Sequence, residues 1–255
     1  MNYDVPIANL IAIFLGAARA GAWLMLCPPF NSRLIPGQIK VLLSVGIALP
    51  MAPHLQGTLP SMETSAIIAA TALQVFVGAA LGFITYLLFA AIQAAGDLID
   101  VFGGFTMAAA YDPLSQNQSS VFGRFYNLVA ATLLFATDGH QMVLRGFMES
   151  YKTLPLNSSF SMETLNRLLI EGVAEMFVSA IQIAGPLIAV LFLTDVAFGL
   201  LNRVAPALNA FQLGFPAKIF LVLTLSGTAI ALLPRVLDGV IDKAVSAVVH
   251  LSGGG

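Results

Sequence analysis

Long apolar runs separated by short polar breaks dominate the pattern of this chain. Charges, prolines and glycines divide it into apolar blocks at 5–30, 39–52, 64–110, 121–137, 165–201 and 216–250. No Asp, Glu, Lys or Arg occurs between Lys40 and Glu63, between Glu63 and Asp97, or between Glu175 and Asp195. Each of these gaps approaches or exceeds the about 20 residues that a helix needs to cross a bilayer. The pattern therefore predicts segments embedded in a membrane.

Helices are the predicted elements of these segments. Backbone amides in hydrocarbon need partners within the protein, and only helices and closed β-barrels supply them. The alternating pattern of a barrel strand is absent, and residues 66–95 and 178–193 are rich in Ala, Leu and Ile. Ser61–Thr64 and Ser161–Thr164 predict helix starts, because hydroxyl residues cap helix N-termini and an acidic residue suits the positive end of the helix dipole. We therefore expect an all-α membrane protein.

Several features argue against six regular spans. The charge-free runs at 125–137 and 219–234 are shorter than a usual span, and runs of that length are often re-entrant or buried in protein. Prolines at 50, 53 and 60 predict a connection over 50–60. We expect long, broken helices and helical hairpins that form a single domain over 1–255, with a flexible Gly-rich tail at 252–255.

Composition narrows the classes of function. Hydrophobic residues make up 58% of the 255 positions and charged residues only 9%, whereas soluble domains carry about 25% charge. The net charge is −2 and the eleven Lys and Arg residues are scattered singly, so no basic stripe exists that could follow a phosphate backbone. The sequence thus excludes nucleic acid as a partner and predicts contact with membrane lipid.

Catalytic and metal-binding motifs are missing from the sequence. The single cysteine, Cys27, and three well-separated histidines do not give the spacing of a metal site. Neither a Gly-x-Ser-x-Gly nucleophile elbow nor a phosphate-binding Gly-Lys-Ser/Thr loop occurs. We expect no enzyme activity, no catalytic residue and no cofactor.

Four charged residues are candidates for chemistry within the membrane. Asp97 and Asp100 lie three apart and would share one side of a helix. They would form a proton relay or cation site, as buried membrane carboxylates often do, or else cap a helix end or line a wet protein interface. Asp195 and Arg203 are candidates for charges buried in protein, with an intersubunit pair as the preferred interpretation. A proton- or solute-coupled transporter using these four residues is the alternative function.

The segment Gly103–Ser120 differs from its apolar neighbours. Glycine supplies backbone freedom, and Phe105 and Met107 supply adaptable apolar contact, which suits a deformable seal. An ordinary turn between helices explains the same composition. The candidate seal residues are Gly103, Gly104, Phe105, Met107, Tyr111, Asp112 and Pro113.

The segment Leu200–Lys218, with the sequence LLNRVAPALNAFQLGFPAK, resembles the FliR family of the bacterial flagellar type III export gate, to which the injectisome subunit SctT is related. Three other regions agree in order: Pro28–Pro36 with Arg33, the block Gln93–Pro113, and Asp138–Ser150. The resemblance spans nearly the whole chain.

This resemblance implies a subunit that joins FliP and FliQ, with FlhB and FlhA completing the gate. The complex would pass unfolded flagellar proteins across the inner membrane at the flagellar basal body. The fold would pack helically with the other subunits and resemble a FliP-like part joined to a FliQ-like part. The related injectisome subunit remains an alternative.

The resemblance also assigns roles to residues. The loop matching Gly103–Ser120 would help close the pore. The motif residues would hold a break between helices and act in assembly; they are Asn202, Arg203, Pro206, Asn209, Phe211, Gly214, Pro216 and Lys218.

Overall fold

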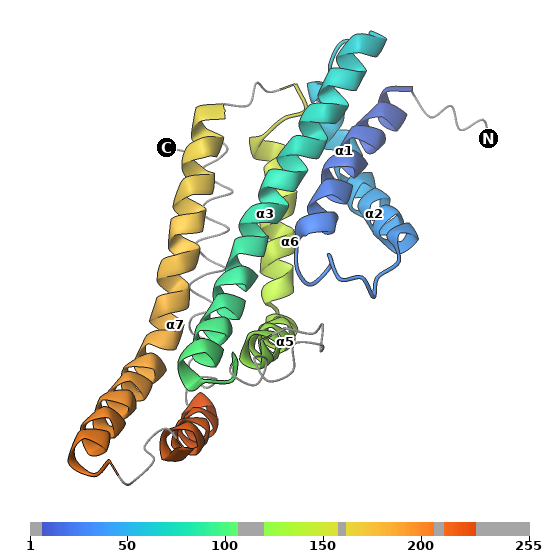
Figure 1. The fold of residues 1–255 in the computed structure, drawn as a ribbon. Coiled ribbons are helices and arrows are strands. Elements are labelled where there is room, and N and C mark those ends of the chain that lie inside the picture. The colour runs from blue at the N-terminus through green and yellow to red at the C-terminus, as the bar shows by residue number, and fades with distance from the viewer. Residues whose placement is uncertain (1–6, 107–119, 158–161, 207–211, 228–255) are drawn as a thin grey trace, which may run out of the picture. The chain divides into compact units, whose positions relative to one another are not determined.

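The computed structural model describes residues 7–106, 120–157, 162–206 and 212–227 (Figure 1). These residues contain helices and no strand, which confirms the predicted all-α class. The elements are α1 (Ile7–Leu26), α2 (Gly37–Leu55), the 3₁₀ turn η1 (Gln56–Thr58), α3 (Thr64–Gly103), α5 (Val121–Ala136), α6 (Gly139–Thr153), α7 (Met162–Val204) and helix 212–227.

Two helices are far longer than a bilayer requires. With 40 and 43 residues, α3 and α7 extend over about 60 and 65 Å, whereas the hydrocarbon core measures about 30 Å. By length and composition, α1, α2 with η1, α3 and α7 could each cross a membrane. The shorter apolar helix α5 covers most of the first of the two runs that were predicted to be too short for a usual span, and helix 212–227 covers the described part, 219–227, of the second.

The predicted connection over 50–60 is wrong in its first part. Helix α2 continues through Pro50 and Pro53 and ends at Leu55, and η1 follows directly. The ring of proline fixes φ near the helical value, so a helix can pass through proline at the cost of the missing N–H bonds. Pro186 likewise lies within α7 without ending it.

The described residues fall into two compact units. One contains residues 7–88, 138–157 and 162–172, and the other contains 89–106, 120–137, 173–206 and 212–227. The first unit therefore holds α1, α2, the first part of α3 and α6. The second holds the end of α3, α5, most of α7 and helix 212–227.

Small residues bring the helices of the first unit close together. A Cβ atom added at Gly78 would lie 2.1 Å from the carbonyl oxygen of Arg19, and one at Gly82 would lie 2.9 Å from that of Trp23. Gly78 and Gly82 are four apart and share one side of α3, so the backbones of α1 and α3 can approach closely. Helix α2 packs beside α1 (Figure 1), where an added Cβ at Gly16 would lie 3.2 Å from Ala48 Cβ.

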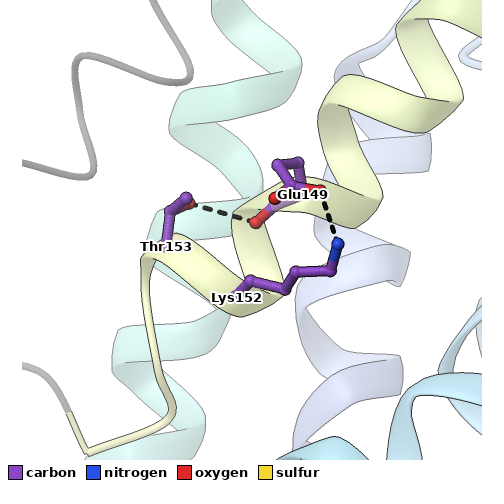
Figure 2. A network of polar contacts seen from close by, with 3 residues as sticks. All are labelled: Glu149, Lys152 and Thr153. Atoms are coloured by element: carbon purple, nitrogen blue, oxygen red, sulfur yellow. Dashed lines mark hydrogen bonds and ion pairs between the residues drawn. The ribbon is translucent and has the colours of Figure 1, made fainter. Parts of the chain in front are cut away.

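Helix α6 lies outside the apolar blocks of the sequence because charged and polar residues cover one of its faces. Its buried residues recur every three or four positions, and include Val143, Gly146, Phe147, Ser150 and Tyr151. This period of an amphipathic helix is the signal that could have predicted it. Figure 2 shows the exposed side, where Lys152 Nζ pairs with Glu149 Oε2 at 2.9 Å and the hydroxyl of Thr153 donates to the Glu149 carbonyl at 3.1 Å.

Arg19 of α1 is the buried charge at the centre of the first unit, with 0% of its surface exposed. Its Nη1 donates to the carbonyl of Ser150 at 2.8 Å and its Nη2 to the carbonyl of Leu154 at 2.7 Å. Its Nε donates to Gln74 Oε1 of α3 at 2.7 Å. Ser150 and Leu154 belong to the last turn and the C-cap of α6, where the dipole favours a cation. The Ser150 carbonyl also accepts the Leu154 N–H at 2.9 Å, whereas the Leu154 carbonyl lies beyond the last helical turn and accepts from Arg19. Arg19 therefore joins three helices and caps one of them.

Aromatic rings complete this centre. The guanidinium carbon of Arg19 lies 4.7 Å from the centre of the Tyr151 ring, and the Tyr151 hydroxyl donates to the Gly16 carbonyl at 2.7 Å. Trp23 stacks on Phe147 with ring centres 4.4 Å apart. The cation–π contact and the stacked rings enclose the guanidinium in apolar surface.

Replacing Arg19 should destabilise the first unit strongly. Arg19→Met removes the Arg19 donors of the Leu154 carbonyl and of Gln74 Oε1, and one of the two donors of the Ser150 carbonyl, which we expect to cost about 3 kcal/mol of unfolding free energy. Arg19→Lys keeps the charge but lacks the planar fork, so we expect an intermediate loss. Thermal unfolding of the full chain in detergent measures both. Arg167→Met is the control, because the Arg167 side chain is 71% exposed; an equal loss in this control would contradict the prediction.

Candidate functional site

The N-terminus of α5 is capped from the end of α3. Asp100 is 2% exposed, and its carboxylate accepts a hydrogen bond from the Ser120 hydroxyl and one from the Phe122 N–H, at 3.1 Å to Oδ2. Ser120 is the N-cap of α5, and its oxygen also accepts from the Gly123 N–H at 2.7 Å. Two free N–H groups of α5 are thereby satisfied, and a negative charge lies at the positive end of its dipole. Asp100 and Ser120 together cap the N-terminus of α5.

Asp97 lies one turn earlier, at a close crossing of α3 and α5. An added Cβ at Gly123 would lie 1.9 Å from Asp97 Oδ1, and one at Gly96 would lie 2.5 Å from the Phe122 carbonyl oxygen. Glycine at both positions lets the two backbones meet. Asp97 is half-buried in this crossing.

The end of α3 forms a Schellman motif. Gly104 has φ +83°, a left-handed conformation that glycine adopts without strain. The Phe105 N–H donates to the Asp100 carbonyl at 3.0 Å, and the Gly104 N–H donates to the Val101 carbonyl at 3.3 Å. These are the two bonds that define the motif, and they leave the carbonyl of Phe102 to find another donor.

The two described ends of the segment Gly103–Ser120 lie together. Asp100 binds Ser120, and the rings of Phe105 and Phe122 meet edge to face with centres 5.2 Å apart. Of the candidate seal residues, Gly103, Gly104 and Phe105 form this base. Met107, Tyr111, Asp112 and Pro113 lie outside the described residues.

Asp195 of α7 has a partner within the same chain. Its Oδ1 lies 2.5 Å from Nζ of Lys218, on helix 212–227, and Lys218 Nζ also lies 3.4 Å from the Phe102 carbonyl oxygen. The Lys218 side chain is 18% exposed and that of Asp195 51% exposed. Lys218 therefore donates to the Phe102 carbonyl, which the two bonds of the Schellman motif do not use. Sequence reasoning missed this pair because its members are 23 residues apart and belong to different helices.

The remaining motif residues surround the break between α7 and helix 212–227. Helix α7 ends at Val204, two residues before Pro206, and Arg203 is exposed on its last turn. Pro216 is exposed on helix 212–227, while Gly214 is buried. Asn209 and Phe211 lie outside the described residues.

A hollow of about 360 Å³ lies beside the Asp195–Lys218 pair. It is lined by residues from the end of α3, from α7 and from helix 212–227, among them Gly104, Thr106, Phe198, Asn202, Gly214 and Phe215. The end of α3 and the motif of 202–218 therefore form one site in the second unit.

The fold and this site define the class: an all-helical membrane protein whose helix ends are bonded by charged side chains from other helices. The family model of the bacterial export proteins, family 1, matches residues 10–244, and the chain belongs to that family. The predicted family resemblance is thereby confirmed.

Three related proteins support the membership of this family. The chain is 32% identical to the flagellar biosynthetic protein FliR of Pectobacterium carotovorum over 216 residues, covering 85% of this chain and 83% of that protein. It is 31% identical to FliR of Bacillus subtilis, with 82% of each chain covered. FliR of Escherichia coli is 29% identical, with 86% and 82% covered.

Filling the α3–α5 crossing should disrupt the second unit. A methyl group at Gly123 would collide with Asp97 Oδ1 and would lie 2.6 Å from Ser120 Oγ, so Gly123→Ala should lower the melting temperature of the full chain in detergent. The expected loss is about 2 kcal/mol, in the range of overpacked cores. Gly185→Ala is the matched control, because nothing lies within 4 Å of its added Cβ. There the better helix propensity of alanine should preserve or raise stability, and equal melting temperatures for the two variants would refute the expectation.

Proposed function

We propose that this chain is a subunit of the flagellar type III export gate in the bacterial inner membrane, within the flagellar basal body. It helps to form and seal the channel through which unfolded flagellar proteins leave the cytoplasm. FliP, FliQ, FlhB and FlhA are its proposed partners. The observation that carries the proposal is an apolar surface longer than one bilayer can cover.

Helix α7 supplies that surface. Its exposed large apolar side chains are Ile170, Val173, Phe177, Val178, Ile181, Phe192, Leu193, Val196, Leu200, Leu201 and Val204. From Ile170 to Val204 the axis rises about 51 Å, at 1.5 Å per residue. A hydrocarbon core of about 30 Å would cover that length only at a tilt above 50°, beyond the usual range of about 0–40°.

The charges of α7 show which part of its apolar surface a bilayer can cover. The charge-free stretch between Glu175 and Asp195 rises about 29 Å and fits one bilayer. Beyond Asp195, helix α7 still exposes Val196, Leu200 and Val204, the last with 84% of its surface. Large exposed apolar patches mark sites of protein contact. Other subunits of an assembly are the fitting cover for this end of α7.

The family and the names of the relatives support the flagellar branch over the injectisome. The chain covers more than four fifths of three proteins that are each named flagellar biosynthetic protein FliR. A part in a multi-subunit export machine also accounts for the apolar surface, which a transporter acting alone would not need.

The sealing role is proposed for the segment Gly103–Ser120. Its base is fixed by the Asp100–Ser120 bond and the Phe105–Phe122 contact, while the segment itself supplies small and flexible side chains. A conduit for many unfolded sequences needs such a seal, because specific recognition by the pore would slow some of its cargo.

Deleting the gene should abolish flagellar export. The measurement is the amount of hook and filament protein outside the cell, with a plasmid copy of the gene as the control that restores it. A non-motile deletion strain that still exports these proteins normally would contradict the proposal.

Shortening the segment between Thr106 and Ser120 should raise the ion leak through the assembled complex, because the seal would no longer span the pore. Ion conductance of cells or reconstituted bilayers measures the leak. Shortening the unrelated connection at Leu59–Glu63 is the control. Unchanged conductance in an assembled complex with the shorter segment would count against the seal.

The variant Asp97→Asn distinguishes the function of an export gate from that of a coupled transporter. A transporter that moves protons through this carboxylate predicts loss of coupling with the complex intact. The export-gate proposal predicts either tolerance or failed assembly, because Asp97 lies in a packed helix crossing. Comparison of complex recovery with export rate distinguishes the two.

A further inference from the structure

We propose that Phe215, Lys218 and Val222 form a clamp that fixes the turn at Gly103–Gly104, the turn from which the segment proposed as a seal begins. The sealing part of this inference rests on the proposed function. The clamp gives Lys218 a role at this turn, in addition to its expected role in assembly.

The three clamp residues share one face of helix 212–227. Positions 215, 218 and 222 are three and four apart, the spacing of neighbours along a helix side. Each meets a different part of the turn. A Cβ added at Gly104 would lie 2.9 Å from the Phe215 ring, and one added at Gly103 would lie 2.9 Å from Val222 Cγ2. Glycine at positions 103 and 104 therefore leaves the space that the clamp residues need.

Lys218 adds a polar bond between these two apolar contacts. The Schellman motif satisfies the carbonyls of Asp100 and Val101 but not that of Phe102, to which Lys218 Nζ donates. A cation at this position also suits the negative end of the α3 dipole. Asp195 of α7 holds the ammonium group in place at 2.5 Å. The end of α3 is therefore bonded through one lysine to a carboxylate on α7.

Apolar packing alone does not hold the turn at Gly103–Gly104 in one position. The hollow of about 360 Å³ borders Gly104, Thr106 and Phe215, so the turn has open space on one side. The ion pair is half-exposed through Asp195, and ion pairs that water reaches add little to stability. Breaking the pair should therefore free the turn without unfolding the unit.

The experiment measures the position of the turn and the leak in the same complexes, purified through this chain. Cysteines for spin labels replace Thr106 and Phe220, both exposed, in a Cys27→Ala background. Distance distributions between the labels are compared for the parent, Lys218→Met and Asp195→Asn. The expected result is a narrow distribution in the parent, a clearly broader one in both variants, and a severalfold increase in ion conductance.

Two further variants serve as controls. The exchanged pair Asp195→Lys with Lys218→Asp should restore the attraction between α7 and helix 212–227 but not the low leak, because it places a carboxylate, which cannot donate, against the Phe102 carbonyl. Lys152→Met breaks an exposed ion pair on α6 and should change neither readout. If Lys218→Met fails to assemble, Asp195→Asn and the exchanged pair decide the question.

A steric test is independent of charge. Gly103→Ala should push Val222 away and broaden the distribution, because the branched side chain of valine is stiff. Adding Val222→Ala should reverse the change by restoring space.

Unchanged distance distributions in Lys218→Met, Asp195→Asn and Gly103→Ala would overturn the clamp, whatever the leak. Broader distributions without leak, in a complex that does leak when the segment 107–119 is shortened, would overturn its role in sealing. If the shortened segment also fails to leak, the proposed seal is wrong, and the distance measurement alone decides whether the clamp exists.

Discussion

The structure depends on one constraint: a helix that ends among apolar side chains must still find partners for its free backbone groups. In this chain charged side chains from other helices supply them. Arg19 of α1 bonds carbonyls at the end of α6, Asp100 of α3 accepts an N–H from the first turn of α5, and Lys218 bonds a carbonyl at the end of α3. In each case the sign of the charge matches the dipole of the helix end that it meets.

This constraint explains why the few charges of the sequence matter so much. Water satisfies most helix ends in a soluble protein, so a single cap adds little specificity. Here an unsatisfied end would cost several times more, and each charge also joins two or three helices. Close glycine crossings at Gly78, Gly82, Gly96 and Gly123 bring the backbones near enough for these side chains to reach. The charges and the glycines together specify which helices meet.

The same chemistry connects the fold to the proposed function. Helices α3 and α7 are about twice as long as a bilayer is thick, and α7 exposes apolar side chains along most of its length. Such a chain is an incomplete structure until other subunits cover it. The segment proposed as a seal starts from the end of α3 that Lys218 bonds, so closure would depend on contacts within this chain and on its place in the assembly.

Much of the fold could be predicted from the sequence, since long charge-free runs leave helices as the natural choice. The starts of α3 and α7 follow from Ser61–Thr64 and Ser161–Thr164, and α5 was rightly expected to be short. Helix α6 was missed because an amphipathic helix does not appear in a search for apolar blocks. The connection at Pro50 and Pro53 was misplaced because proline can continue a helix.

The site was harder to predict. Asp100 and Asp195 could be selected as unusual charges, but their partners could not, because Ser120, Phe122 and Lys218 lie in other elements of the fold. Arg19 was not among the selected charges, although a lone charge within an apolar run indicates buried hydrogen-bond acceptors around it. Lys218 was recognised only through the family motif. Pairing between distant residues is a property of the fold, and the pattern along the chain does not contain it.

We infer that protein, and not lipid, covers the far end of α7. A photo-cross-linking amino acid placed at Val204 or Leu200 in the chain expressed in its own cells tests this directly, with mass identification of the adducts. We expect adducts with other export-gate subunits at both positions. Adducts with lipid alone at both positions, in cells that export flagellar proteins normally, would contradict it.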